Sequence, residues 1–148
     1  MQWTLQEGCD VCGAERCAFC QLADGTVRRL CTDSGLTQML EQCVETALWS
    51  STDPDTEEPL DDTFGPDDLD NDRWLELLSD CDSFRECNAA DLADIEPGQA
   101  GHDFWLTRNR HGAGFWDRGL GEAGERLTAA AHVYGGIDLM PLSGGKVG

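Results

Sequence analysis

The stretch DPDTEEPLDDTFGPDDLDND (residues 53–72) divides the chain and limits how the rest of it can fold. Its twenty residues carry ten carboxylates and three prolines, with no Lys or Arg. Such a composition, without apolar periodicity, is typical of a solvated connection rather than of a helix or strand. We therefore expect an acidic linker or irregular loop over residues 51–72, with ordered elements on either side of it.

The negative charge of the chain is concentrated around this stretch. The 148 residues carry a formal net charge of −19: residues 53–103 contribute −16, residues 1–52 contribute −4 and residues 104–148 contribute +1. This balance argues against direct binding to nucleic acid, whose phosphates attract Lys and Arg. It favours a basic protein partner, including one that itself faces DNA or RNA. General adaptation to high salt is the alternative. The single lysine, Lys146, fits it, whereas the near-neutral C-terminal block does not.

Length and hydropathy limit the architecture further. A chain of 148 residues with 40% apolar side chains suits one domain, or one domain with a small appendage, around a modest core. No run of about 18 apolar residues is present, so no membrane span is expected. The N-terminal MQWTLQEGCD lacks a basic segment followed by an apolar one, so we expect a cytoplasmic protein rather than a secreted one.

On the N-terminal side of the acidic stretch, residues 36–50 carry the clearest helical pattern in the chain. The preceding TDSG (residues 32–35) supplies side chains that cap a helix N-terminus. Cys43 falls on the apolar stripe, so we expect it in the core rather than at a metal. The stripe repeats at helical spacing and consists of Leu36, Met39, Leu40, Cys43, Val44, Ala47 and Leu48.

Residues 1–35 are predicted to form a small cysteine-rich metal module. The sequence CDVCGAERCAFC (residues 9–20) contains two Cys-x2-Cys pairs, and each pair can present two thiolates to one cation at about 2.3 Å. Asp24-Gly25 then predicts a β-hairpin turn, and Cys31 closes the second strand. Four thiolates would complete a tetrahedral shell, which favours structural zinc. The expected ligands are Cys9, Cys12, Cys17 and Cys20, with Cys31 as the alternative ligand.

Two other states of these cysteines stay open. An iron–sulfur cluster also takes cysteine ligands, and the thiols can instead remain reduced or form disulfides. The gap of four residues between the pairs is shorter than the roughly one dozen residues or more between the pairs of a typical zinc ribbon. In a reducing compartment, close cysteine pairs bind metal more often than they form disulfides, so zinc remains the preferred interpretation.

On the C-terminal side, residues 73–148 are expected to form a small α+β domain. Its predicted elements are helices over residues 73–87 and 89–95, a β-hairpin of strands 103–109 and 115–118, and a last helix up to Tyr134. The Pro97-Gly98 pair is expected to end the helix that precedes it. The fold class is therefore α+β: an N-terminal metal-bound β-hairpin, three central helices, and a C-terminal β-hairpin followed by a helix. The proposed segments are residues 1–35, 36–50, 51–72 and 73–148.

The C-terminal part contains the block HDFWLTRNRHGAGFWDRGLGEAGERLT (residues 102–128). It resembles a recurrent block, HDFWLTRNxHGAGFWDRGLGExGxRLT, of small acidic phage and prophage proteins of unassigned function. The resemblance covers roughly Asp91 to Tyr134, and the cysteine module lies outside it. It implies a phage-borne accessory protein and brings no catalytic assignment.

This block also gathers side chains that can carry acid–base or ion-pair chemistry. They are His102, Asp103, Arg108, His111, Asp117 and Arg118. His beside Asp is the material of general acid–base catalysis, and the Gly-rich HGAG can offer backbone amides to an anion. No nucleophile elbow, phosphate-binding loop or HExxH motif accompanies them. We therefore expect structural or partner-contacting roles and no enzyme activity.

Three functions remain to be compared. The first is an acidic inhibitor, adaptor or DNA mimic that binds a basic, nucleic-acid-facing host protein, in the manner of anti-restriction or anti-CRISPR proteins. The second is a zinc-containing nucleic-acid-binding or regulatory module that uses Arg16, Arg28 and Arg29, and the third is an enzyme. The charge favours the first. Its candidate contacts are Asp61, Asp62, Asp67, Asp68, Asp70, Asp72, Glu76 and Asp80.

Overall fold

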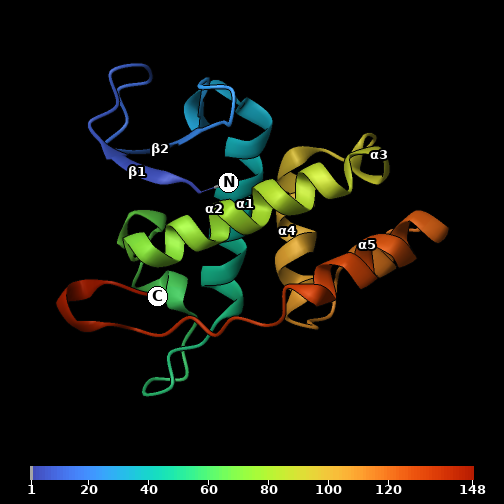
Figure 1. Ribbon diagram of the computed structural model, residues 1–148. Helices are drawn as coiled ribbons and strands as arrows, with labels where there is room; N and C mark the ends of the chain where they lie inside the picture. Colours follow the sequence, from blue (N-terminus) through green and yellow to red (C-terminus); the bar gives the residue numbers. More distant parts are fainter. Residues whose placement is uncertain (1) are drawn as a thin grey trace.

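Residues 2–148 are described in the computed structural model, which sets a small β-sheet beside a larger body of helices (Figure 1). The α+β class expected from the sequence is confirmed. The strands are β1 (Thr4–Glu7), β2 (Arg16–Gln21) and β3 (Val27–Arg29). The helices are α1 (Ser34–Ser50), α2 (Asn71–Cys87), α3 (Ala89–Leu92), α4 (Pro97–Arg108) and α5 (Glu122–Val133). Short 3-10 helices are η1 (Leu30–Thr32), η2 (Leu60–Asp62), η3 (Pro66–Asp68), η4 (Phe115–Asp117) and η5 (Ser143–Gly145).

The sheet is antiparallel with the strand order β1-β2-β3. The hairpin expected at Asp24-Gly25 is the connection from β2 to β3: Gly25 has φ of 88°, and the Thr26 backbone N donates to Asp24 Oδ1 at 2.9 Å. A positive φ of this kind suits glycine, which has no Cβ. Strand β1 adds a third strand to the predicted hairpin, with Leu5 opposite Ala18.

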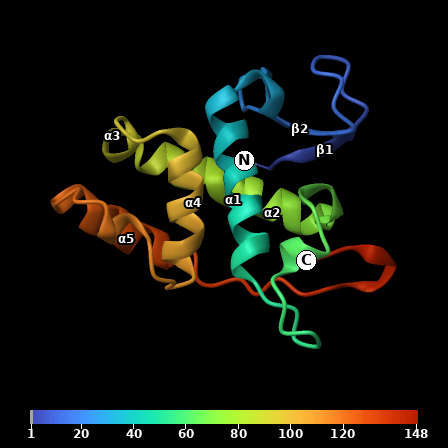
Figure 2. The same cartoon turned by 180° about the vertical axis from the view of Figure 1, so that it is seen from behind.

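Helix α1 is the central element of the body, and α4 lies beside it in both ribbon views (Figures 1 and 2). Asp33 caps α1, since its Oδ1 accepts a hydrogen bond from the Leu36 backbone N at 3.1 Å. The apolar stripe of α1 is buried, and Cys43 is in the core as expected. The two helices approach closely at Gly101, where an added Cβ would lie 2.1 Å from the Met39 carbonyl oxygen.

The C-terminal β-hairpin expected over residues 103–109 and 115–118 is wrong. The first of these segments belongs to α4, and the second contains η4. Pro97 begins α4 instead of ending the previous helix, because a proline at the first helical position loses no backbone hydrogen bond. The last turns of α4 are buried on all sides, so they show no amphipathic period that would identify a helix in the sequence.

Aromatic side chains join α2, α4 and the C-terminal segment. Phe84 of α2 stacks on Phe104 of α4 with ring centroids 4.3 Å apart and on Phe115 of η4 at 5.7 Å. Tyr134 presents its ring edge to Phe104 at 5.2 Å. Offset and edge-to-face contacts of this kind add to the free energy of apolar burial.

The acidic stretch is more ordered than the expected irregular loop. It contains η2 and η3, and Leu60 and Leu69 are both 1% exposed in the core. The C-terminal segment is hydrogen-bonded to the acidic stretch. The Asp70 backbone N donates to the Val147 carbonyl at 2.8 Å, and the Val147 backbone N donates to the Asp68 carbonyl at 2.9 Å. Within residues 2–148, no helix combines the length and apolar character needed to cross a bilayer.

Candidate metal centre and neighbouring side-chain clusters

A tight turn after β1 positions the first two cysteines. The Gly13 backbone N donates to the Cys9 carbonyl at 2.8 Å, and the Cys9 backbone N donates to the Ala14 carbonyl at 2.9 Å. Gly13 has φ of 72°, a conformation that a residue with a Cβ adopts only with strain. Cys9 and Cys12 therefore share one knuckle, as the first Cys-x2-Cys pair predicts.

Four cysteine sulfurs converge at this knuckle. The Sγ atoms of Cys9, Cys12, Cys17 and Cys31 all lie within 4.8 Å of one another, and those of Cys9 and Cys31 are 3.7 Å apart. In a tetrahedral shell with metal–sulfur bonds of about 2.3 Å, the sulfurs are separated by about 3.8 Å. The four cysteines can therefore hold a metal ion, and their spacing fits a tetrahedral shell.

Cys20 is not part of this group, and the alternative ligand Cys31 is. The second Cys-x2-Cys pair lies in strand β2, where successive side chains point to opposite faces of the sheet. Cys17 and Cys20 are three residues apart and therefore face opposite ways. Cys20 is buried on the other face, and its register partner in β3 is Arg28. The turn η1 after β3 returns Cys31 to the knuckle.

The surroundings of the sulfurs set their pKa values apart. Backbone N–H groups of Cys12 and Val11 donate to the Cys9 sulfur and lower its pKa to about 6. Burial and the neighbouring sulfurs of Cys17, Cys9 and Cys12 raise the pKa of Cys31 to about 12. Four thiolates in such close contact repel one another, and a bound cation would remove that repulsion. The donor set thus fits a cation that takes thiolates.

A buried ion pair fastens the sheet to α2. Asp82 is 5% exposed, and its carboxylate lies 2.9 Å from Arg28 Nη2 and accepts a hydrogen bond from Trp3 Nε1 at 3.3 Å. Burial raises the pKa of Asp82 despite the adjacent guanidinium. The sequence alone does not reveal this contact, because nothing in the local pattern relates a β-hairpin arginine to an aspartate on a distant helix.

Part of the C-terminal block forms a cluster around Asp103. This carboxylate is 1% exposed and accepts two hydrogen bonds from Arg118, at 2.9 and 3.1 Å, and one from Gln99 at 2.8 Å. His102 Nδ1 lies 3.0 Å from Asp103 Oδ1, and the His102 ring is 6.0 Å from that of Trp49. The cluster borders a hollow of about 610 Å³. The sequence did not indicate a role for Gln99 or Trp49, because neither belongs to a motif.

Arg108 has a structural place in the fold. It is 3% exposed, and its Nη1 donates to Asp80 Oδ2 at 2.8 Å. Its Nε and Nη2 donate to the carbonyls of Gly135 and Tyr134 at 2.9 and 3.1 Å. A buried charge with all these partners fixes the end of α4 against α2 and the segment after α5. The remaining block residues, His111 and Asp117, are exposed and lie outside both clusters.

The candidate partner-binding acids divide into two groups. Asp61, Asp62, Asp67, Asp72 and Glu76 are exposed, whereas the others are half-buried and have structural contacts. Asp68 accepts from the Gly65 backbone N and Asp70 from the Asp72 backbone N, while Asp80 pairs with Arg108.

A scan against protein-family models, a search of curated proteins and a search of solved structures each returned no match.

Proposed function

We propose that the chain is a non-enzymatic acidic protein that binds a basic surface of another protein. A zinc ion stabilises its N-terminal module. The observation that carries this proposal is the unneutralised charge. Among residues 2–148, seven carboxylates have a basic side chain within 4.0 Å: Asp33, Glu76, Asp80, Asp82, Glu86, Asp91 and Asp103. Most of the 29 acidic side chains therefore face solvent without a cation.

Zinc is the metal that best suits the four cysteines. An all-sulfur set of tetrahedral size favours Zn²⁺ or an iron–sulfur cluster over Ca²⁺ or Mg²⁺, which take oxygen ligands. Four protein ligands leave no open position, so the ion is structural. Metal analysis of the purified protein tests this, and the expected result is one zinc per chain with no visible absorbance. Bound iron and a brown colour would instead assign an iron–sulfur cluster to the four cysteines.

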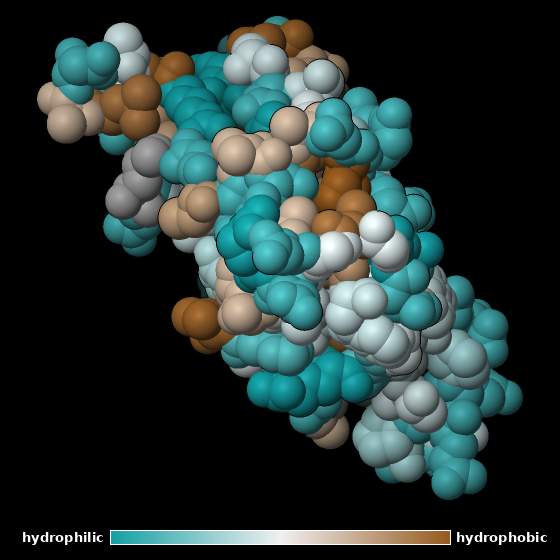
Figure 3. All heavy atoms as spheres, turned by 90° about the vertical axis from the view of Figure 1, so that its right-hand side faces the viewer, coloured by the Kyte–Doolittle hydropathy of each residue, from teal (hydrophilic) through white to brown (hydrophobic). Residues whose placement is uncertain are grey.

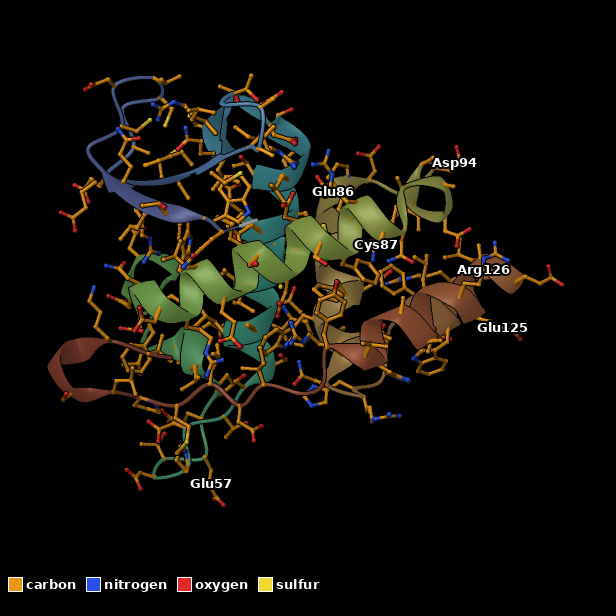
Figure 4. All side chains as sticks on the ribbon, in the orientation of Figure 1. Glu57, Glu86, Cys87, Asp94, Glu125 and Arg126 are labelled. Carbon is orange, nitrogen blue, oxygen red and sulfur yellow. The ribbon has the colours of Figure 1, made fainter. Side chains whose placement is uncertain are left out.

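The binding surface begins at the ordered acidic stretch. Asp61 and Asp62 of η2, Asp67 of η3 and Asp72 and Glu76 of α2 are exposed on neighbouring elements. Glu57 stands at the tip of the loop after α1, whereas Glu86, Asp94 and Glu125 lie on the other side of the molecule, near α3 and the neighbouring ends of α2 and α5, and are not part of this surface (Figure 4). Such a surface attracts a cationic partner over about 10 Å at moderate salt and raises the association rate.

The partner class follows from this charge and from the resemblance of the C-terminal block. A basic surface broad enough to meet these acids is typical of proteins that bind DNA or RNA. The resemblance to acidic phage proteins supports a phage-type accessory protein that acts in the host cytoplasm as an inhibitor, adaptor or DNA mimic of the anti-restriction or anti-CRISPR kind. The arginines of the cysteine module do not favour nucleic-acid binding, because Arg16, Arg28 and Arg29 all bond to groups within the chain.

Capture from a host lysate tests the proposal when it is combined with competition. The wild-type protein should retain basic proteins at about 0.05 M salt and release them at about 0.5 M salt or when double-stranded DNA is added. A variant with Asp61→Asn, Asp62→Asn, Asp67→Asn and Asp72→Asn should lose most of this capture.

The matched control removes the same charge elsewhere. Glu45, Asp94, Glu122 and Glu125 are exposed and lie outside the acidic stretch. Changing them to Gln or Asn removes the same four negative charges but leaves residues 53–72 intact. If both variants lost the same amount of capture, overall charge and not the acidic stretch would account for binding, as salt adaptation predicts. Capture that DNA does not displace would exclude mimicry.

A further inference from the structure

A groove of about 880 Å³ runs between the N-terminal sheet, α1 and the start of α2. One end is formed by the metal knuckle, where Cys12, Cys17 and Cys31 contribute to the wall. The other end reaches Asp67 of η3 and Asn71 of α2. The groove therefore connects the metal centre with the acidic stretch, which are far apart in the sequence.

The floor of the groove is apolar. Leu30, Leu40, Val44 and Trp74 line it, and all four are largely buried by their neighbours. By contrast, the face formed by α3 and α5 is mostly hydrophilic, with only small hydrophobic areas (Figure 3). A hollow with an apolar floor offers a partner a place to bury a side chain, which a flat charged surface does not.

The rim of the groove is acidic. Glu7, Glu15 and Glu41 line it together with Asp67, and all four side chains are exposed. Two cations also line it, but both contact the chain itself. Arg16 donates to the Leu69 and Pro66 carbonyls at 2.7 and 3.1 Å and lies over the Trp74 ring, and Lys146 Nζ lies 3.4 Å from the Asp67 carbonyl.

We propose that this groove is the anchor site for a basic amphipathic segment of the protein partner. Apolar side chains of that segment enter the groove, and its flanking Lys and Arg side chains meet the glutamates of the rim. The proposal rests on the function proposed above and adds what charge alone lacks: opposite charge mainly raises the association rate, whereas a buried apolar anchor slows dissociation.

The acidic rim decides between possible occupants. A nucleic-acid strand would bring phosphates against Glu7, Glu15 and Glu41, so base insertion is disfavoured. A small apolar ligand would fit the volume and leave the glutamates unused. A basic segment with an apolar side satisfies both the floor and the rim.

A designed peptide pair tests the proposal. The probe is a Leu/Lys peptide of about 15 residues with all leucines on one helical face, labelled for fluorescence anisotropy, and its control has the same composition in a scrambled order. The full-length, metal-loaded protein is expected to bind the amphipathic peptide at least about tenfold more tightly than the scrambled one at about 0.5 M salt, where surface charge is screened.

Two double variants of equal charge locate the site. At about 0.05 M salt, Glu15→Lys with Glu41→Lys reverses the rim and should weaken binding of the amphipathic peptide at least about tenfold, while Glu122→Lys with Glu125→Lys reverses the same number of exposed charges on α5 and should have a much smaller effect. Circular dichroism verifies that both variants remain folded.

The remaining outcomes overturn the proposal in distinguishable ways. Equal affinity for the two peptides at high salt, with salt-sensitive binding of both, removes the groove but leaves the acidic-surface function. No binding of either peptide at low salt contradicts both proposals. An apolar dye that binds in the groove and resists displacement by the amphipathic peptide would assign the groove to a small molecule instead.

Discussion

The three-stranded sheet and the helical body are stabilised by different interactions. The body buries the apolar stripe of α1 against α2 and α4 and stacks aromatic rings between helices. The sheet has strands of three to six residues, and two of the three buried hydrophobic side chains in these strands, Cys17 and Cys20, are cysteines. A sheet this small buries too little apolar surface for independent stability. Apolar packing stabilises the body, whereas the sheet would gain stability from a metal ion held by its four neighbouring cysteines.

Removal of one metal ligand should produce the largest effect and separate the two regions. Cys17→Ser leaves three sulfurs in the shell, so we expect loss of the bound metal and unfolding of residues 4–31, because metal binding and folding of such modules are coupled. Far-UV circular dichroism should retain most of its helical signal. Hydrogen exchange should accelerate in the three strands and stay slow in α1 and α4.

Cys20→Ser is the matched control for that variant. It replaces a buried cysteine of the same strand whose side chain points away from the knuckle. It should keep the full metal content, with a modest loss of stability because a hydroxyl replaces a buried thiol. If Cys20→Ser lost the metal as well, the assignment of Cys31 in place of Cys20 would be wrong.

The helical body should respond most strongly to the loss of Arg108. Arg108→Met leaves Asp80 and the Gly135 and Tyr134 carbonyls without their donor, and each buried acceptor left without a partner costs about 1–3 kcal/mol. Urea unfolding measures the loss. The metal content should not change. Arg126→Met is the control, because Arg126 pairs with Asp91 at the exposed surface and should have a much smaller effect.

The sequence predicted the elements whose local pattern matches their environment. Helix α1 has one buried and one exposed side, so its stripe was visible, and its cap at Asp33 lies within the predicted TDSG segment. The hairpin at Asp24-Gly25 was visible because the turn needs the conformation that glycine provides. The first Cys-x2-Cys pair was recognisable for the same reason, since its spacing fits one tight turn.

Tertiary contacts account for what the sequence did not reveal. Helix α4 contacts α1 and α5, and Phe84 of α2 stacks on its Phe104, so its aromatic run resembled a buried strand rather than one side of a helix. The second Cys-x2-Cys pair has the spacing of a knuckle but lies in a strand, and only the pairing of β2 with both neighbours shows that Cys20 points away. The groove joins segments that no local pattern relates.

The contact between α1 and α4 gives a smaller but sharper test of packing in the body. In Gly101→Ala, the new Cβ would lie 2.1 Å from the Met39 carbonyl oxygen, so the helices must separate, at a cost of about 1–3 kcal/mol or more. Gly98→Ala is the control in the same helix: its Cβ would lie 4.0 Å from that of Gln42, and the better helix propensity of alanine should leave stability unchanged or slightly higher.

Both variants should keep the metal, because the knuckle lies away from this contact. Thermal unfolding followed by circular dichroism would rank the two. A Gly101→Ala protein as stable as Gly98→Ala would mean that α4 does not lie this close to α1.

Asp33 connects the two regions, and its replacement should have the smallest effect. It caps α1 and pairs with Arg85 of α2 at 2.8 Å and with Arg28 of β3 at 3.4 Å. Asp33→Ala should cost about 1 kcal/mol through loss of the cap. Asp33→Asn can keep the cap while removing the charge, so the difference between the two variants isolates the contribution of the ion pairs.

The pH dependence of that difference has a definite sign. Burial favours the neutral acid, but hydrogen bonds from Arg85 and the Leu36 N–H outweigh it, so the pKa of Asp33 lies below its ordinary value. The carboxylate therefore stabilises the fold fully above its unfolded pKa of about 3.9, and this contribution is lost as the pH falls through the lower folded pKa. Wild type and Asp33→Asn should differ in urea stability at pH 7 and pH 5, and the difference should shrink as the pH falls below the unfolded pKa of about 3.9. A constant difference would show that Asp33 acts through its shape alone and that its charge does not hold the sheet to the body.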